Sequence, residues 1–264
     1  MTKRFDKEAR IVSNSALRED VWLMEILAPD IATSASAGQF CMLKPNPQSK
    51  DPLLRRPLSI HSVDEKNGTV AFLYRVVGRG TKLLASKSPD ETLRVLGPLG
   101  NGFDIKSDAI HMLVGGGLGI APLLLLAQRL QGEKAIVIIG ASSKEWLLRQ
   151  DVFAKTGHEL YAVTEDGSQG QKGLVTDLLS DFLLKSTKHN QKILVYACGP
   201  MPMLKAVALL SKDFDAECQV SVETVMACGT GLCLGCAITG RNGFLHACKD
   251  GPCLDAELLD WSLV

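Results

Sequence analysis

The sequence predicts a multi-domain α+β protein built from three successive parts, and three observations lead to this prediction. Residues 1–103 alternate short segments rich in β-branched residues with turn-forming Gly, Pro, Asn and Asp. Residues 104–220 alternate continuous apolar strands with segments of helical periodicity. Residues 221–264 carry five of the eight cysteines in the chain. We therefore expect an antiparallel β-barrel, then a doubly wound parallel α/β sheet, then a small cysteine-rich segment.

The first part should form six short strands and one helix. The strands are expected at residues 9–17, 21–27, 38–45, 57–63, 69–78 and 91–100, and the helix at 80–87. Strands of this length and spacing are typical of a small antiparallel barrel or sandwich.

The second part should form a parallel sheet whose strands are buried on both faces. Strands are expected at residues 109–116, 134–141, 159–166, 192–199 and 218–225, and helices at 120–130, 142–155, 173–183 and 202–213. Strands that alternate with helices in this way indicate a doubly wound sheet with helices on both sides.

The composition excludes several classes of function. Lys+Arg and Asp+Glu balance at 29 each, so no net charge attracts nucleic acid or anionic lipid. The N-terminus lacks the apolar run of a secretory signal, and the longest apolar stretch, residues 120–130, is too short to span a bilayer. We expect a cytoplasmic protein without a nucleic-acid or membrane partner, in which clustered cysteines indicate metal or redox chemistry rather than disulfides.

A run of glycines separates the first strand of the parallel sheet from its helix. The glycines are Gly115, Gly116, Gly117 and Gly119. Such a turn brings backbone amides and a helix N-terminus close to a pyrophosphate, although tight structural turns also use glycine. The run departs from G-x-G-x-x-G, and the strand at 134–141 is followed by no acidic residue that could bind an NAD ribose.

A second turn, Cys198-Gly199-Pro200, ends another strand of the same sheet. Cys198 alone could be a small buried hydrophobe. Because the carboxyl ends of parallel strands meet at one edge, one shared ligand explains both turns most simply.

Two segments of the barrel could hold a second phosphate-containing ligand. Arg56 could bind a phosphate through its planar guanidinium, and Ser59 lies three residues further along the same strand. Gly78 and Gly80 precede Thr81 at the start of the expected helix, where backbone N–H groups could bind a phosphate. A solvated arginine and an ordinary turn are the alternatives.

Three cysteines of the last part, Cys228, Cys233 and Cys236, have the x4 and x2 spacing of plant-type 2Fe–2S sites. The glycines between them suit a loop folded around a cluster. Zinc is the competing interpretation, but it would normally use two well-separated pairs. The cluster needs a fourth thiolate, and Cys248 and Cys253 are both candidates.

Together these motifs resemble the ferredoxin–NADP reductase superfamily. Its R-x-[YPL]-[ST] flavin motif matches residues 56–59, its G-x-G-T loop matches residues 78–81, and its nicotinamide turns match "GGGLGIAP" and "CGP". The resemblance implies an FAD site formed by Arg56, Pro57, Leu58, Ser59, Leu73, Tyr74, Arg75, Gly80 and Thr81. It implies a dinucleotide site formed by Gly115, Gly116, Gly117, Gly119, Cys198, Gly199, Pro200 and Met201, and no catalytic acid or base.

The segments "DPLLRRPLSI", "TEDGSQGQKGLVTDLL" and "ACKDGPCL" resemble the electron-transfer subunits of class B dihydroorotate dehydrogenase. This resemblance selects Cys248 as the fourth cluster ligand and leaves Cys253 as a free thiol. His246 could suggest a Rieske-type ligand set, but we expect it to be a bystander near the cluster. The resemblance implies a chain with FAD and a 2Fe–2S cluster that serves pyrimidine biosynthesis. The implied partner is an FMN-containing catalytic subunit, in a heterotetramer of two plus two. Electrons would pass from FMN through the cluster and FAD to NAD⁺.

Other interpretations of the sequence stay open. One is the small flavin and iron–sulfur subunit of an NADPH–ferredoxin or sulfide-linked oxidoreductase, and another is a zinc-stabilised binding module without catalytic activity. The choice between NAD and NADP is also open, because Ser142, Ser143 and Lys144 could accommodate a 2′-phosphate. Only the family resemblance favours NAD.

Overall fold

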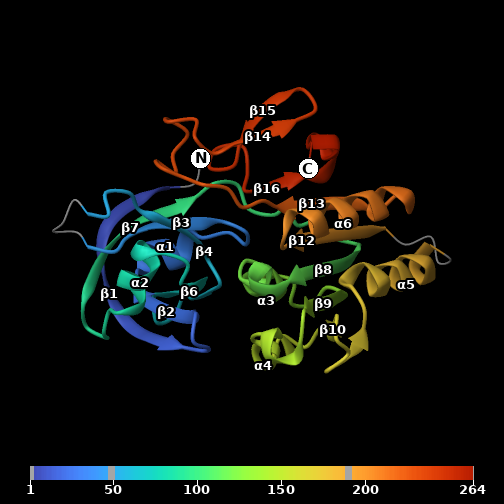
Figure 1. Ribbon diagram of the computed structural model, residues 1–264, viewed down its shortest axis with the longest axis horizontal. Coiled ribbons are helices and arrows are strands. Elements are labelled where there is room, and N and C mark those ends of the chain that lie inside the picture. Colours follow the sequence, from blue (N-terminus) through green and yellow to red (C-terminus); the bar gives the residue numbers. More distant parts are fainter. Residues whose placement is uncertain (1–2, 47–50, 188–191, 264) are drawn as a thin grey trace.

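The computed structural model describes residues 3–46, 51–187 and 192–263. A curled antiparallel sheet and a parallel sheet lie side by side, and the C-terminal segment lies across the top of both in the view of Figure 1. This arrangement of an antiparallel half-barrel beside a parallel sheet confirms the predicted fold class.

The first sheet has seven antiparallel strands in the order β4-β3-β7-β1-β2-β6-β5. They are β1 (Phe5–Ala16), β2 (Val21–Leu27), β3 (Phe40–Lys44), β4 (Arg56–Ser59), β5 (Ser62–Asp64), β6 (Thr69–Arg75) and β7 (Thr92–Leu99), with α1 (Pro29–Ser34) and α2 (Arg79–Ala85) between them.

The single strand expected at residues 57–63 is divided into β4 and β5. The Ile60 N–H donates to the Gln39 carbonyl, and the His61 N–H donates to the Ala71 carbonyl. The chain therefore changes partner from β3 to β6 at this point, and it joins the two edge strands of the curled sheet by doing so.

The second sheet has the order β11-β10-β9-β8-β12-β13-β16, and all its pairs are parallel except the last. Its strands are β8 (Ile110–Gly116), β9 (Ala135–Ala141), β10 (Glu159–Thr164), β11 (Gln171–Lys172), β12 (Ile193–Cys198), β13 (Glu217–Ser221) and β16 (Cys253–Asp255). The main helices are α3 (Leu123–Arg129), α4 (Gln150–Ala154), α5 (Val175–Thr187) and α6 (Met201–Asp213).

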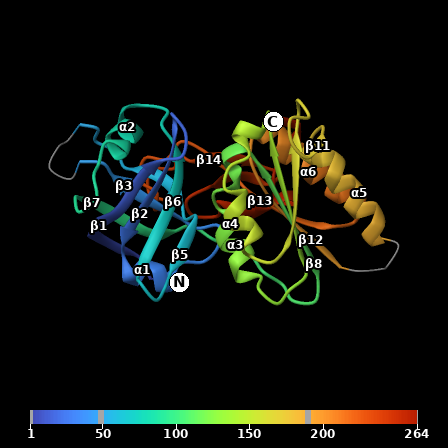
Figure 2. The ribbon, with the colours of Figure 1, turned by 90° about the horizontal axis from the view of Figure 1, so that it is seen from below.

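Residues of the parallel strands alternate between two hydrophobic cores. Leu113 and Val137 pack in a core shared with α3 and with the interior of the barrel. Met112 and Ile136 pack on the opposite face with residues of α5 and α6. Figure 2 shows the same division, because α3 and α4 lie between the sheet and the barrel while α5 and α6 cover the outer side. The barrel and the α/β part thus share one core.

The helix expected at residues 142–155 is much shorter in the structure. A 3₁₀ turn at Lys144–Trp146 is followed by α4, and the two are separated by Leu147 and Leu148, whose side chains are buried. Arg149 has φ 59°, which interrupts helical hydrogen bonding. The chain therefore buries Leu147 and Leu148 in a non-helical conformation, although the local sequence has helical periodicity.

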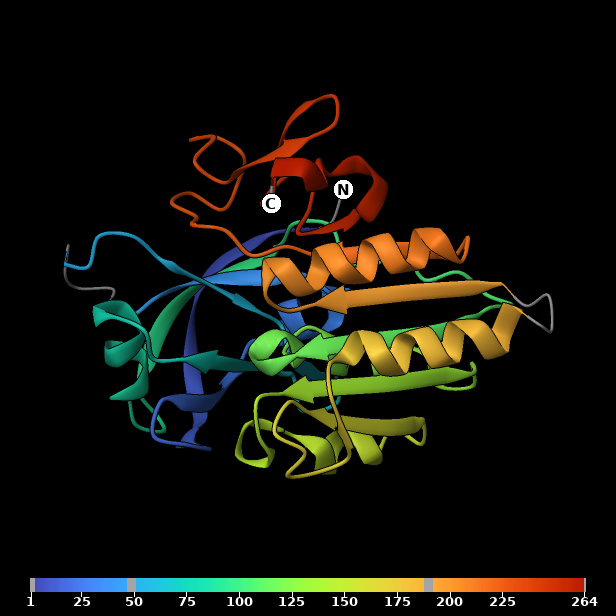
Figure 3. The same ribbon diagram turned by 45° about the vertical axis from the view of Figure 1, so that its right-hand side comes forward.

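The C-terminal segment is joined to both sheets (Figure 3). It contains the hairpin of β14 (Ala237–Gly240) and β15 (Gly243–His246), and then β16, which pairs antiparallel with β13. The Asn101 N–H, just after the barrel, donates to the Gly251 carbonyl at 2.6 Å. These contacts fix residues 228–248, which carry four cysteines and are called the cysteine loop below, relative to both parts of the molecule.

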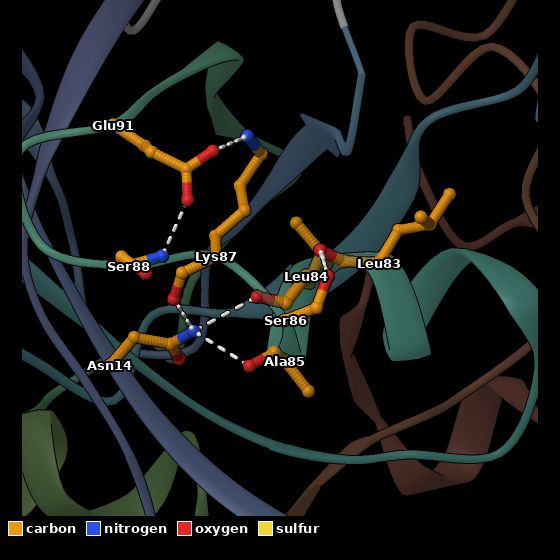
Figure 4. Close-up of polar contacts among 8 residues, drawn as sticks. All are labelled: Asn14, Leu83, Leu84, Ala85, Ser86, Lys87, Ser88 and Glu91. Carbon is orange, nitrogen blue, oxygen red and sulfur yellow. Dashed lines mark hydrogen bonds and ion pairs between the residues drawn. The ribbon is translucent and has the colours of Figure 1, made fainter.

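The end of α2 is anchored by Asn14 of β1. Its side-chain amide donates to the carbonyls of Leu84, Ala85 and Lys87 at 2.9, 3.3 and 2.8 Å, as Figure 4 shows. Its amide oxygen accepts from the Tyr74 hydroxyl at 3.3 Å. Asn14 therefore satisfies carbonyls that helix termination leaves unpaired, and it ties α2 to β6.

Candidate functional site

A cavity of about 310 Å³ lies where the barrel meets the parallel sheet. Eight of the nine residues expected around FAD line it, namely Arg56, Pro57, Leu58, Ser59, Leu73, Tyr74, Arg75 and Thr81. The turn after β8 contributes Leu118 and Ala121, and the end of β13 with the chain that follows it contributes residues 221–224 and Met226. The structure thus brings together residues that are far apart in the sequence.

Gly80, the ninth residue, lies directly against Arg56. A Cβ atom at Gly80 would be 2.1 Å from Arg56 Nε, so only glycine allows the guanidinium to lie on the first turn of α2. Arg56 Nη1 donates to the Leu54 carbonyl at 2.7 Å, which holds this position. The Arg56 guanidinium is therefore a positively charged hydrogen-bond donor beside the cavity, and such a group can bind the negatively charged pyrophosphate of a flavin dinucleotide.

Thr81 shapes the loop that precedes α2. Its hydroxyl donates to the Gly78 carbonyl at 3.0 Å and accepts from the N–H groups of Val77 and Gly78 at 3.0 and 3.2 Å. These bonds fold residues 77–81 around one side chain.

Glu223 also lines the cavity, and sequence analysis did not select it. Glu223 is exposed as a residue, but protein atoms near its carboxyl displace part of the hydration shell, and this desolvation raises its pKa. Burial, together with the charge of Glu223, also raises the pKa of the Cys198 thiol. Its place just after β13, at the carboxyl edge of the sheet, is the signal that could have identified it.

A second cavity, of about 500 Å³, lies at the carboxyl edge of the parallel sheet. Gly116, Gly117 and Pro200 line it, and it extends past residues 140–142 to Glu165 and to residues 173–176. Arg75 and Leu118 line both cavities, so the two are adjacent. The Arg75 guanidinium also lies 5.0 Å from the centre of the Trp146 ring, and both residues line the second cavity.

The other expected dinucleotide residues form the wall behind this cavity. A Cβ atom at Gly119 would be 2.2 Å from the Cys198 carbonyl oxygen, and one at Gly199 would be 2.6 Å from Met203 Cε. One at Gly115 would similarly be 2.7 Å from the Ile120 side chain, and Met201 begins α6. The two turns are therefore packed against each other, and the close approach requires glycine.

The cysteine loop brings four thiols together in two close pairs. Cys236 Sγ and Cys248 Sγ are 3.2 Å apart, and both residues are buried. Cys228 Sγ accepts from the Thr230 and Cys233 N–H groups at 3.4 and 3.5 Å, and Cys233 is exposed. Within the described ranges, no three His, Cys, Asp or Glu side chains are arranged around a single metal ion.

Backbone N–H groups point at the sulfur atoms and change their acidity. Burial opposes ionisation of Cys228, but the Thr230 and Cys233 N–H groups outweigh it and lower the pKa of this thiol. Burial and the neighbouring Cys236 raise the pKa of Cys248, although the Gly231 N–H donates to its sulfur at 3.1 Å. Amides turned toward thiolate sulfur, and two pairs of thiols, fit the Cys₄ ligand set of a 2Fe–2S cluster.

Cys253 lies apart from this loop. It belongs to β16, and its thiol donates to the Gly38 carbonyl at 3.6 Å. A Cβ atom at Gly38 would be 2.3 Å from its sulfur, so the thiol fills a gap between the barrel and the sheet.

The cysteine loop adjoins the first cavity. A Cβ atom at Gly229 would be 2.6 Å from Met42 Cγ, so the loop rests on β3 of the barrel. Met226 lines the cavity and is two residues from Cys228, a separation of at most about 7 Å along an extended chain. A cluster held here would lie next to a flavin.

A flavin-sized cavity, an adjacent cavity with dinucleotide turns and a four-thiol loop together define an iron–sulfur flavoprotein of the oxidoreductase class. Two family models match the chain: an oxidoreductase NAD-binding domain over residues 113–209, and the iron–sulfur cluster binding domain of dihydroorotate dehydrogenase B over residues 223–260. The chain belongs to the family of dihydroorotate dehydrogenase B electron-transfer subunits. FAD, a 2Fe–2S cluster and NAD are its cofactors.

Individual relatives cover nearly the whole chain. The NAD⁺-type electron-transfer subunit from Desulforamulus reducens is 35% identical over 99% of this chain and 100% of its own length. The one from Caldanaerobacter subterraneus subsp. tengcongensis is 38% identical over 96% of this chain and 98% of its own length.

Solved structures give the same fold. That of an NADH-dependent reduced ferredoxin–NADP oxidoreductase, described for flavin-based electron bifurcation, has a TM-score of 0.85 and 31% identity over 97% of this chain and 90% of its own. A ferredoxin reductase of carbazole 1,9a-dioxygenase, at 20% identity and a TM-score of 0.62 over 80% of this chain and 65% of its own, shares the fold alone. No helix in the described part of the chain is long and apolar enough to cross a membrane.

Proposed function

We propose that the chain carries electrons from an FMN-containing dihydroorotate dehydrogenase catalytic subunit to NAD⁺. The names of its relatives, NAD⁺-type electron-transfer subunits of dihydroorotate dehydrogenase B, support a dihydroorotate dehydrogenase partner and NAD⁺ as the acceptor. The bound flavin supplies the chemistry that joins one-electron and two-electron transfer. We further propose a cytoplasmic location, where thiols that bind iron are kept reduced.

The order of the three sites is the observation that carries the proposal. The four-thiol loop adjoins the flavin cavity through Met226, and the flavin cavity adjoins the dinucleotide cavity through Arg75 and Leu118. The residues of these three sites would hold the carriers in series, and the shared lining of the two cavities would allow a flavin and a nicotinamide to lie close together.

We assign the cluster ligands as Cys228, Cys233, Cys236 and Cys248. Contacts among their sulfurs and the amides of the same loop support this set, whereas the Cys253 thiol bonds to Gly38. The FAD and dinucleotide residues are assigned as the sequence motifs imply, with Gly80, Gly115, Gly119, Cys198 and Gly199 giving the cavities their shape.

The partner is proposed to dock over the exposed side of the cysteine loop. Cys233 is exposed there, and Leu232 and Leu234 beside it are 85% and 57% exposed. Val225 and Phe244 of the same segment are 84% and 72% exposed. Exposed apolar side chains that gather on one surface are typical of an interface, and electrons would enter on the side where the cysteines are nearest the surface. We propose two copies of each subunit in the complex.

A second candidate function is supported by the solved structure that is 31% identical over nearly the whole chain. In that case the chain would be the small subunit of an NADPH–ferredoxin type oxidoreductase. The two candidates share all the sites within this chain and differ in the partner.

Purification of the native complex tests the proposal. We expect an FMN-containing subunit that oxidises dihydroorotate when NAD⁺ is present. Leu232→Asp should release this partner, whereas Leu209→Asp, at an exposed leucine of α6, should not. A partner without FMN that reacts with ferredoxin or NADPH would contradict the proposal and favour the second candidate.

A further inference from the structure

His61 lies in the short link between β4 and β5, and it is fully buried. Its backbone N–H donates to the Ala71 carbonyl of β6 at 2.8 Å, so the barrel fixes its position. Ser59, two residues earlier, lines the flavin cavity. His61 is therefore a buried polar side chain next to the segment that forms the flavin site, although the motifs of the two cavities do not include it.

Both ring nitrogens of His61 are hydrogen bonded to the α/β part of the molecule. Nδ1 lies 2.8 Å from the carbonyl oxygen of Ala121, which follows the 3₁₀ turn after β8. Because a carbonyl oxygen can only accept, Nδ1 carries the proton and donates. Nε2 accepts from Arg149 Nε at 3.4 Å, and Arg149 directly precedes α4. One imidazole thus joins the barrel to the chain after β8 and to the chain after β9.

These two bonds select one form of the imidazole. Burial lowers the pKa of His61 to about 4; the Ala121 carbonyl opposes this shift, and the charge of Arg149 adds to it. The ring is therefore neutral at pH 7, with its single proton on Nδ1. Since a guanidinium can only donate, Arg149 keeps Nε2 as the acceptor. Arg149 thereby fixes both the tautomer and the orientation of the ring that binds Ala121.

The carbonyl that His61 binds belongs to the turn between the two cavities. Ala121 lines the flavin cavity, and its N–H donates to the Leu118 carbonyl at 2.9 Å. Leu118 lines both cavities. Barrel residues form most of the flavin cavity, and turns of the parallel sheet form much of the dinucleotide cavity. The separation of the two reacting rings therefore depends on how these turns are held against the barrel.

We propose that His61, together with Arg149, is a positioning residue that sets the separation between flavin and nicotinamide. It acts through the Ala121 turn, which it fixes relative to the barrel. Reacting atoms must lie about 3–3.5 Å apart, and a displacement of about 1 Å can lower the rate about 100-fold. The inference rests on the proposed function only in taking the two cavities as the sites of FAD and NAD.

The ion pair of Arg129 with Glu65 provides a matched control. Its Nη2–Oε1 distance is 2.6 Å, and it also joins the α/β part to the barrel, but both side chains are exposed. Exposed pairs of this kind contribute little to stability. Arg129→Gln therefore removes a contact between the same two parts without releasing the Ala121 turn.

The first test needs no electron transfer. In the full chain labelled with ¹⁵N-histidine, NMR should show His61 as a neutral ring with its proton on Nδ1 at pH 7. Hydrogen–deuterium exchange of residues 117–121 should be faster in His61→Leu and in Arg149→Met than in the wild type. Arg129→Gln should leave this exchange unchanged. A ring with its proton on Nε2, or unchanged exchange in both His61→Leu and Arg149→Met, would overturn the inference.

The second test measures transfer between the two rings. NADH is mixed anaerobically with the full chain that carries its flavin and cluster, and the limiting rate of flavin bleaching is measured at saturating NADH. His61→Leu should lower this rate by about tenfold, whereas flavin content and the NADH concentration that gives half the rate should change less than about threefold. Arg149→Met should lower the limiting rate by a smaller factor, and Arg129→Gln should not change it.

His61→Asn separates positioning from packing. Its amide N–H can replace the Nδ1–H donor, so this variant should keep most of the rate that His61→Leu loses. A packing role alone gives the opposite order, because Asn fills less of the buried site than Leu. A slower rate in His61→Asn than in His61→Leu would overturn the inference. An unchanged rate in Arg149→Met would also overturn it, whether or not His61→Leu folds.

These results are distinct from a failure of the proposed function. None of them bears on the partner subunit, because NADH reduces the flavin of this chain directly. Failure of NADH to bleach the flavin of the wild type would contradict the proposed function and the inference together.

Discussion

Substitution of Gly80 by alanine should cost the protein its flavin. The new Cβ atom would lie 2.1 Å from Arg56 Nε and 2.5 Å from Arg56 Cζ, whereas ordinary contacts begin at 3.4 Å. To increase its distance from the new Cβ atom from 2.1 to 3.4 Å, Arg56 Nε must move by about 1.3 Å or more. Because Arg56 is the end of a flexible side chain, we expect it to move away from the cavity while the fold is retained.

The expected loss follows from the strength of a charge-assisted hydrogen bond. Removal of one such bond to the flavin pyrophosphate costs about 1.5–3 kcal/mol, or about 10- to 150-fold in affinity. The assay is flavin content after dialysis, followed by titration of the apoprotein with FAD. Circular dichroism should show an unchanged fold.

Gly78 provides a matched control two residues away. A Cβ atom there meets no atom within 4 Å, and its φ of −171° is extended backbone that any residue adopts. Gly78→Ala should therefore bind FAD like the wild type. Full flavin retention in Gly80→Ala, or equal loss in both variants, would refute the role assigned to the contact between Gly80 and Arg56.

Three further predictions concern the cluster, the barrel and the Glu223 carboxyl. Cys248→Ser should lose its iron, as assayed by metal analysis, whereas Cys253→Ser should retain it; iron loss only in the second variant would contradict the ligand set. Asn14→Ala should lower the free energy of unfolding by about 1–3 kcal/mol, because carbonyls at the end of α2 lose their donor, and urea denaturation measures this. Because desolvation raises the pKa of Glu223, its ionisation opposes folding, and the wild type should lose stability relative to Glu223→Gln as the pH rises above about 4.5. Thermal melts at pH 4 and pH 7 check this, and a constant difference between the two proteins would be the contrary result.

Much of the fold could be predicted from the sequence because its signals are local. Alternation and β-branched runs located the strands of both sheets, and glycines and prolines located the turns between them. The FAD motif could likewise be recognised because residues 56–59 and 78–81 are two short continuous segments.

The features that could not be predicted depend on contacts between distant segments. The division of residues 57–63 into two strands follows from their pairing with β3 and β6, and the pairing of β16 with β13 joins residues about thirty positions apart along the chain. Glu223 was not selected from the sequence, because only the folded chain brings the segment after β13 to the wall of the first cavity.

Anaerobic reduction of the native complex by dihydroorotate tests the central claim most directly. Without NAD⁺, the absorption bands of both the flavin and the iron–sulfur cluster of this chain should bleach. Addition of NAD⁺ should restore them and form NADH in an amount equimolar with the dihydroorotate consumed. Failure of dihydroorotate to bleach the flavin of this chain would contradict the account. Formation of NADH by a complex in which serine replaces all four proposed cluster ligands, Cys228, Cys233, Cys236 and Cys248, would also contradict it.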